Sequence, residues 1–265
     1  MRAVGVIPAR YQASRFPGKP LAIIAGMSMI ERVWRGARGA KSLSRVIVAT
    51  DDARIADACR SFGAEVALTR ADHASGTDRI AEVAAGLDCE AVVNVQGDEP
   101  LIEGFAIDAV VAALAEDGDV PIATLVHAAE PAALADPNRV KVVLDRRGRA
   151  LYFSRSQIPY PREGSEPRCW QHVGIYAYLR EFLLRFPTLP ATPAERAEGL
   201  EQLRALEHGY PIRCAVIEGW TSAAVDVPGD VAAVEARLLA RRPTKSADAQ
   251  RAEGERTRAP AKDGA

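Results

Sequence analysis

The sequence has few cysteine and histidine residues, and neither type has the spacing of a metal site. Its four cysteines are far apart and form no Cys-x-x-Cys pair. Its four histidines form neither a His-x-x-x-His nor a His-Glu-x-x-His pattern. We therefore expect no zinc site and no disulfide framework, and we interpret the cysteines as reduced thiols.

A strong charge imbalance and a long apolar run are also missing. Lys and Arg total 34 against 35 Asp and Glu, which gives a net charge of −1. This balance provides no basic field for nucleic acid, and no apolar run approaches the about 20 residues of a membrane span. The first residues enter a strand pattern directly, without the features of a signal peptide. We expect a cytoplasmic protein that binds neither nucleic acid nor membrane.

What the chain does contain is a regular alternation of short Val- and Ile-rich runs with helical patterns. The runs at 3–9, 44–50, 65–69, 91–98 and 121–127 are typical of buried strands. This alternation predicts an α/β fold with a mostly parallel central sheet. One domain is expected over 1–242, with a smaller sub-domain at about 140–215, where the pattern changes. Residues 243–265 are polar and are predicted to form a disordered tail.

The loop after the first strand has many cations and only one glycine. Its sequence, IPARYQASRFPGKPLA at 7–22, carries Arg10, Arg15 and Lys19 around Gly18. Ligands of parallel sheets bind at the carboxyl ends of the strands, so this loop is predicted to bind phosphate through side chains. A solvated basic loop is the alternative, and it is the more common outcome for a charged loop considered by composition alone.

Acidic residues follow two other apolar runs. Asp98 lies in NVQGDEP at the end of a predicted strand, and Asp226 lies in AAVDVPGD. Magnesium near phosphates is held by few carboxylates, so Asp98 is a candidate ligand, although Gly-Asp is equally typical of a turn. Asp226 is either a helix cap or a second carboxylate of the same site.

A third candidate segment is TRADHASGTDRIAEV, which opens a predicted helix. Thr77 is predicted to cap this helix, whose first N–H groups are suited to anions. The neighbouring Ser75 and Arg79 are not explained by capping alone.

Together these segments resemble one family, the 3-deoxy-D-manno-octulosonate (Kdo) cytidylyltransferases or CMP-Kdo synthetases. The matching motifs also include VIVATDD, RVKVVLD, ALYFSRSQIPY, HVGIYAY and LEQLRALEHG, in the family's order from residue 4 to about 239. The resemblance implies a Rossmann-like nucleotidyltransferase fold and a homodimer joined through the second half. It implies Mg²⁺ as cofactor, CTP and Kdo as substrates, and a place in lipopolysaccharide biosynthesis.

The resemblance also implies roles for individual positions. The catalytic residues would be Arg10, Lys19, Asp98 and Asp226, with Asp98 and Asp226 as the metal ligands. The nucleotide would be bound by Pro8, Ala9, Arg10, Ser14, Lys19, Ser75, Gly76, Arg79, Gln96 and Asp98. The sugar acid would be bound by Arg15, Gln96, Arg155, His172, Tyr176, Glu201 and Gln202.

The sequence departs from the family beside the predicted sugar-acid site. Gln171 stands where the family usually has an arginine, and the segment between Pro161 and His172 is short. A synthetase for another sugar acid, such as an amino analogue of Kdo or a sialic acid, is therefore an alternative. A protein that binds CTP without turnover is a second alternative, against which the joint presence of the four predicted catalytic residues argues.

Overall fold

The computed structural model of the chain describes residues 1–12, 16–163, 165, 167–221 and 223–241. Ser14 and Arg15 lie outside these residues, as does the segment 243–265, for which a disordered tail was predicted. No helix of the described residues is long and apolar enough to cross a membrane.

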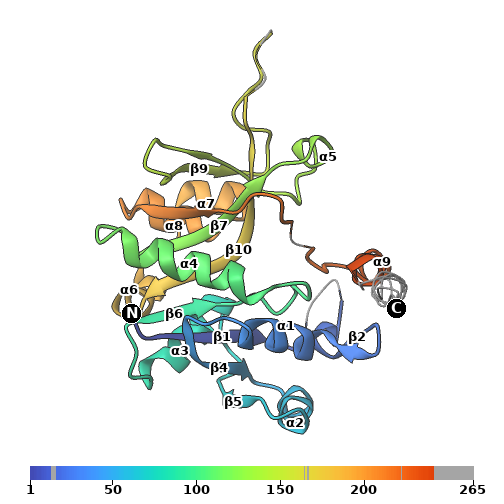
Figure 1. Cartoon of the computed structure of the whole chain (residues 1–265). Helices are drawn as coiled ribbons and strands as arrows, with labels where there is room; N and C mark the ends of the chain where they lie inside the picture. Colours follow the sequence, from blue (N-terminus) through green and yellow to red (C-terminus); the bar gives the residue numbers. More distant parts are fainter. Residues whose placement is uncertain (13–15, 164, 166, 222, 242–265) are drawn as a thin grey trace, which may run out of the picture.

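A central sheet organises the chain, and its strands follow the order β11-β7-β10-β6-β1-β4-β5. Within the sheet, β1 pairs in parallel with β4 and β6, β4 with β5, and β11 with β7, whereas β10 is antiparallel to both β6 and β7. The mostly parallel sheet is thus confirmed, with one reversed strand near its middle (Figure 1). The strands of this sheet are β1 (Ala3–Ala9), β4 (Leu43–Thr50), β5 (Glu65–Leu68), β6 (Ala91–Asn94), β7 (Ile122–Ala128), β8 (Lys141–Leu144), β9 (Ala150–Ser154), β10 (Trp170–Leu179) and β11 (Ile212–Val216). The short strands β2 (Ile23–Ile24) and β3 (Met27–Ser28) pair with each other in a separate sheet.

Helices cover both faces of this sheet, because alternate apolar residues of each strand point to opposite sides. On β1, Ile7 belongs to the core that α1, α2 and α4 bury, and Val6 belongs to the core that α3, α6 and α8 bury. The helices are α1 (Met29–Arg38), α2 (Ala53–Ser61), α3 (Gly76–Ala85), α4 (Gly104–Glu116), α5 (Pro131–Leu134), α6 (Arg180–Arg185), α7 (Pro193–Glu198), α8 (Gln202–Glu207) and α9 (Asp230–Arg241), with short 3-10 turns η1 (Lys19–Leu21) and η2 (Phe186–Thr188).

The second half of the chain is continuous with the central sheet. Strands β8 and β9 form an antiparallel pair around Gly148, whose φ is 73°. They extend the sheet through β8, which pairs with the start of β10. The described residues between β9 and β10 project from the body of the molecule (Figure 1). The predicted sub-domain therefore shares β10 and β11 with the main sheet.

One predicted helix is shorter than the sequence pattern indicates. The pattern predicts a helix from residue 199 to 208, but Gly199 has a left-handed φ of 60° and ends α7 instead. Helix α8 then begins at Gln202. Glycine adopts this conformation at little steric cost and is the usual residue just after a helix.

Candidate active site

A pocket lies at the carboxyl ends of β1 and β6, against the start of α3. This is the edge where parallel sheets bind their ligands. Its lining includes the predicted residues Pro8, Ala9, Arg10, Lys19, Ser75, Gly76, Arg79, Gln96, Asp98 and Asp226. The remaining lining residues, absent from the predicted site, are Phe16, Pro20, His73, Ala74 and Gly97. Each of these lies within one or two positions of a predicted residue, so the pocket is formed by the predicted segments.

Lys19 joins three distant parts of the chain at this pocket. Its Nζ lies 2.8 Å from Oδ2 of Asp98, 2.8 Å from the carbonyl oxygen of Val225 and 3.9 Å from Oδ1 of Asp226. The backbone N–H of Val225 also donates to the carbonyl oxygen of Asp98, at 2.9 Å. The segment before α9 is therefore held against the end of β6, and both predicted metal ligands contact one cation.

These two carboxylates fit a magnesium ion that is shared with a phosphate chain. Magnesium commonly takes one or two protein carboxylates and completes its shell with phosphate and water oxygens. Among the described residues, no group of three or more His, Cys, Asp or Glu side chains is placed to hold a metal by itself. The adjacent Glu99 is buried, and this burial raises the pKa of its carboxyl to about 8, with a further contribution from Asp98. Asp98 and Asp226 are thus the candidate pair.

The start of α3 is capped by Ser75 and not by Thr77. Ser75 Oγ accepts from the backbone N–H of Asp78 at 3.1 Å, and Asp78 Oδ2 accepts from the backbone N–H of Ser75 at 3.0 Å. The prediction of a Thr77 cap was wrong, because Ser75 has the extended backbone of a cap residue and Thr77 already lies within the helix. The helix start lies beside the first strand, where a Cβ at Gly76 would be in ordinary van der Waals contact with Pro8, 3.4 Å from its Cγ.

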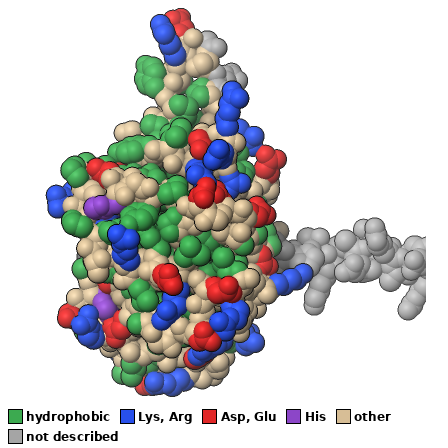
Figure 2. Space-filling model, turned by 90° about the vertical axis from the view of Figure 1, so that its left-hand side faces the viewer, with side chains coloured by type: hydrophobic (Ala, Val, Ile, Leu, Met, Phe, Trp, Pro, Cys, Tyr) green, Lys and Arg blue, Asp and Glu red, His purple; other side chains and the backbone are tan. Residues whose placement is uncertain are grey.

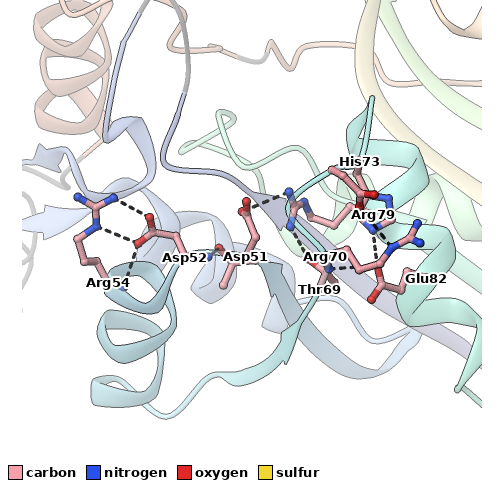
Figure 3. A network of polar contacts seen from close by, with 10 residues as sticks. Asp51, Asp52, Arg54, Thr69, Arg70, His73, Arg79 and Glu82 are labelled. Atoms are coloured by element: carbon pink, nitrogen blue, oxygen red, sulfur yellow. Dashed lines mark hydrogen bonds and ion pairs between the residues drawn. The ribbon is translucent and has the colours of Figure 1, made fainter.

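Arg79 is buried beside this helix start and is held by protein groups (Figure 3). Its guanidinium lies 3.2 Å from Oδ1 of Asp51 and also donates to the hydroxyl of Thr69. In the same network, His73 contacts the carboxylate of Glu82. Arg79 therefore lines the pocket while it ties α3 to the ends of β4 and β5.

Four predicted sugar-acid residues form a second group, on the face of the sheet that carries α3. His172 Nε2 lies 2.9 Å from Oγ1 of Thr124, and its ring packs against Phe153 and Tyr176 with centroids 5.1 and 5.3 Å away. Burial lowers the pKa of His172 to about 3, so its ring is neutral at physiological pH. The group consists of His172, Tyr176, Glu201 and Gln202, none of which lines the pocket described above.

Two contacts connect this group to the pocket. The hydroxyl of Thr77 donates to Oε2 of Glu201. Gln96, which lines the pocket, lies beside β10, where a Cβ at Gly174 would be 3.3 Å from Cγ of Gln96. The two predicted sites are therefore neighbours, separated by Gln96 and Thr77.

Arg155 lies outside both groups and is occupied by backbone oxygens. It donates from Nε to the carbonyl oxygen of Glu198 at 2.6 Å, from Nη1 to Pro137 at 3.0 Å and from Nη2 to Gly199 at 3.3 Å. These contacts hold the turn that leads to Glu201. Arg155 is thus bonded to the backbone of this turn, and its contact with the sugar acid stays a prediction.

Gln171 departs from the family pattern, and its side chain is buried. It neighbours His172 on β10, so the two side chains point to opposite faces of the sheet. Gln171 therefore does not lie on the face of β10 that carries His172.

Comparison with known proteins agrees with this arrangement. A family model described as Cytidylyltransferase matches residues 4–213, so the chain is a member of that class. A 3-deoxy-manno-octulosonate cytidylyltransferase of Syntrophotalea carbinolica is 52% identical over 248 residues, covering 90% of this chain and 99% of the relative. The corresponding Myxococcus xanthus protein is 52% identical over 242 residues, covering 91% and 98%. The chain belongs to the 3-deoxy-manno-octulosonate cytidylyltransferase family.

A solved structure supports the same assignment. CMP:2-keto-3-deoxy-manno-octonic acid synthetase complexed with CTP superimposes with a TM-score of 0.86 and 43% identity, covering 92% of this chain and 100% of that one. A relative with a different printed substrate, the 8-amino-3,8-dideoxy-manno-octulosonate cytidylyltransferase of Shewanella halifaxensis, is 48% identical over 243 residues, covering 90% of this chain and 99% of the relative.

Proposed function

We propose that this protein transfers CMP from CTP to 3-deoxy-D-manno-octulosonate, with release of pyrophosphate, and that it requires Mg²⁺. The observation that carries the proposal is the convergence of Lys19, Asp98 and Asp226 at the pocket beside β1 and β6. The family membership and the CTP complex of a 43% identical structure support it. The product, CMP-Kdo, serves lipopolysaccharide biosynthesis.

In this reaction the anomeric hydroxyl of the sugar acid attacks the α-phosphorus of CTP. A new oxygen–phosphorus bond forms, the bond to the β-phosphate oxygen breaks, and the hydroxyl loses its proton. The triphosphate and the sugar carboxylate repel each other, so catalysis consists mainly of positioning and charge neutralisation. Bound Mg²⁺ supplies part of that neutralisation, and Asp98 with Asp226 would hold it. Arg10 and Lys19 supply the rest from the pocket wall.

The nucleotide is proposed to lie against the start of α3. The first N–H groups of a helix are free to donate, and Ser75 and Gly76 bring this end of α3 to the pocket. The sugar acid is proposed to lie toward Gln96, Glu201 and the neutral His172, which offer hydrogen bonds to hydroxyl groups. Arg15, outside the described residues, is expected to pair with the sugar carboxylate.

A second candidate substrate is an 8-amino analogue of Kdo. The identity of 48% to relatives with that printed substrate favours testing it. Purified protein would be incubated with CTP, Mg²⁺ and either Kdo, its 8-amino analogue or a sialic acid, with pyrophosphate release as the measurement. Release with Kdo above the other acids is the expected result. If pyrophosphate is released only with another acid, that acid is the substrate in place of Kdo. If the protein binds CTP but releases no pyrophosphate with any acid, it is a non-catalytic protein.

A homodimer and a cytoplasmic location are also proposed. Exposed apolar side chains lie in the second half, on β9 at Leu151 and beyond it at Tyr160, with exposures of 62% and 83%. Figure 2 shows hydrophobic side chains over the upper and middle parts of the face it presents, with charged side chains between them. Light scattering after size exclusion tests the dimer, and Leu151→Asp should give the monomer mass. The cytoplasmic location follows from the use of CTP, and fractionation of cells tests it.

A further inference from the structure

The phosphate loop of this protein is tied to α2 through an aromatic ring. The guanidinium carbon of Arg54 lies 3.3 Å from the centroid of the Tyr11 ring. Asp52, which caps α2, holds that guanidinium at two points, with Nε at 3.0 Å and Nη2 at 2.6 Å from its oxygens. A stacked cation whose orientation is fixed by a carboxylate provides a defined platform for the ring.

Tyr11 in turn fixes the part of the loop that precedes Lys19. Its carbonyl oxygen accepts from the backbone N–H of Gly18 at 2.8 Å. Gly18 has a left-handed φ of 73°, and a Cβ at that position would lie 3.2 Å from Cζ of Tyr11. Arg10 directly precedes Tyr11, and Lys19 directly follows Gly18. The Tyr11 ring therefore fixes the position of the backbone next to both cations of the pocket.

The end of β4 carries two adjacent carboxylates that serve different sides of the pocket (Figure 3). Asp51 holds Arg79 at the start of α3, and Asp52 holds Arg54 on the side of Tyr11. Arg54 does not line the pocket, and its charge is paired with Asp52. Its position therefore suits support of the loop and not direct contact with phosphate.

We propose that Arg54 and Tyr11 are positioning residues for the triphosphate, which act by holding Arg10 and Lys19 at the spacing that CTP requires. The inference rests on the proposed function, in that it takes CTP to be the ligand of the pocket. The pair is proposed to affect the binding of CTP and not the binding of the sugar acid. A group that holds a binding cation changes affinity without taking part in bond making.

The test compares Arg54→Ala and Tyr11→Leu with Tyr11→Phe, which keeps the ring, and with Arg60→Ala. Arg60 lies on the same helix and pairs at the surface with Asp57, so it controls for the loss of a charge on α2. The Kd for CTP would be measured by calorimetry, the KM of each substrate by pyrophosphate release, and stability by thermal unfolding. Arg54→Ala and Tyr11→Leu should each raise Kd and KM for CTP about fivefold, with kcat, the sugar-acid KM and the unfolding temperature little changed. Tyr11→Phe and Arg60→Ala should behave as the wild type.

Equal CTP affinity for Arg54→Ala and Arg60→Ala would overturn the inference. So would an equal loss for Tyr11→Phe and Tyr11→Leu, because the ring would then not be the contact that matters. If the variants change CTP affinity in this way but the wild type releases no pyrophosphate, only the proposed function is contradicted, since the inference concerns CTP binding.

Discussion

The hydroxyl of Thr77 donates a hydrogen bond to a carboxylate oxygen of Glu201, 124 residues further along the chain. Thr77 belongs to α3, whose first turn lines the pocket, and Glu201 directly precedes α8. Burial raises the pKa of Glu201, whereas its hydrogen bonds to Thr77 and Ser75 lower it. One carboxylate therefore connects the proposed nucleotide side to the proposed sugar-acid side.

Removing the Thr77 hydroxyl should destabilise the protein, because it deprives the partly buried carboxylate of Glu201 of a donor. Thr77→Val keeps the side-chain shape and should cost about 1–3 kcal/mol of the free energy of unfolding. Thr77→Ser keeps the hydroxyl and is the matched control. Urea unfolding measures both. Equal stability of the two variants would show that the Thr77–Glu201 bond contributes little.

The cations of the opening loop should act on different substrates. Lys19→Ala is expected to impair the use of CTP most, by about tenfold or more in kcat/KM, because it removes a charge-assisted contact. Arg15→Ala, at a position outside the described residues, is expected to impair the use of the sugar acid most. Steady-state kinetics with each substrate varied in turn measure this. Identical profiles for the two variants would remove the proposed division of roles.

Asp98→Asn should abolish most turnover while it preserves the fold. The amide retains the size of the carboxylate and an oxygen for the Lys19 ammonium, but it loses the charge that a magnesium ligand supplies. A loss of about 100-fold or more in kcat is expected. Circular dichroism and a Mg²⁺ titration would accompany the assay, and Asp57→Asn on the surface of α2 is the control. A near-normal rate would mean that the metal site lies elsewhere.

Acid should destabilise the protein through His172. Its pKa is lowered from 6.5 to about 3 in the folded protein, so the unfolded chain binds a proton that the folded chain does not. The contribution of the neutral His172 ring to the free energy of unfolding is therefore fully present above pH 6.5 and is lost as the pH falls toward 3. The free energy of unfolding should change through this group by at most about 1.4 kcal/mol per pH unit.

The measurement is the free energy of unfolding by urea at a series of pH values between those limits. His172→Gln should flatten the profile in this window. The same change at the exposed His208 should leave the profile nearly as in the wild type. If both variants have equal slopes, another group controls the acid transition.

The position of the pocket could be predicted from the sequence, because the carboxyl ends of parallel strands meet at one edge of a sheet. Arg10 follows a predicted strand, Gln96 and Asp98 lie at the end of another, and Ser75 stands at the start of a predicted helix; all four line one pocket. The residues around Asp226 left two alternatives, a helix cap or a metal ligand, and the family resemblance implied the metal ligand. Its contact with Lys19 depends on a chain path that local sequence does not encode.

Other features could not be predicted because they depend on long-range contacts. The Ser75 cap is an exception, because Asp78 lies three residues after Ser75 and completes a capping box, whereas Ile80 stands three residues after Thr77. Arg155 lies in a motif of the family, but its partners are backbone oxygens of a turn more than 40 residues away. The hydrophobic pattern of β10 predicts that the strand is buried, but it does not predict that the strand runs antiparallel to β6 and β7 or lies between them.

The place of β10 between β6 and β7 also constrains the order of assembly during synthesis. Strand β7 pairs with β10 and β11, and with no strand before it among the residues that the structure describes. When the ribosome has released the first half, β6 can join β1, but β7 has no edge on which to dock until residues 170–179 have emerged. Until then, the edge of β6 that pairs with β10 in the complete sheet stays unpaired. A pause in translation before residue 170 would therefore lengthen the time during which this strand edge can aggregate.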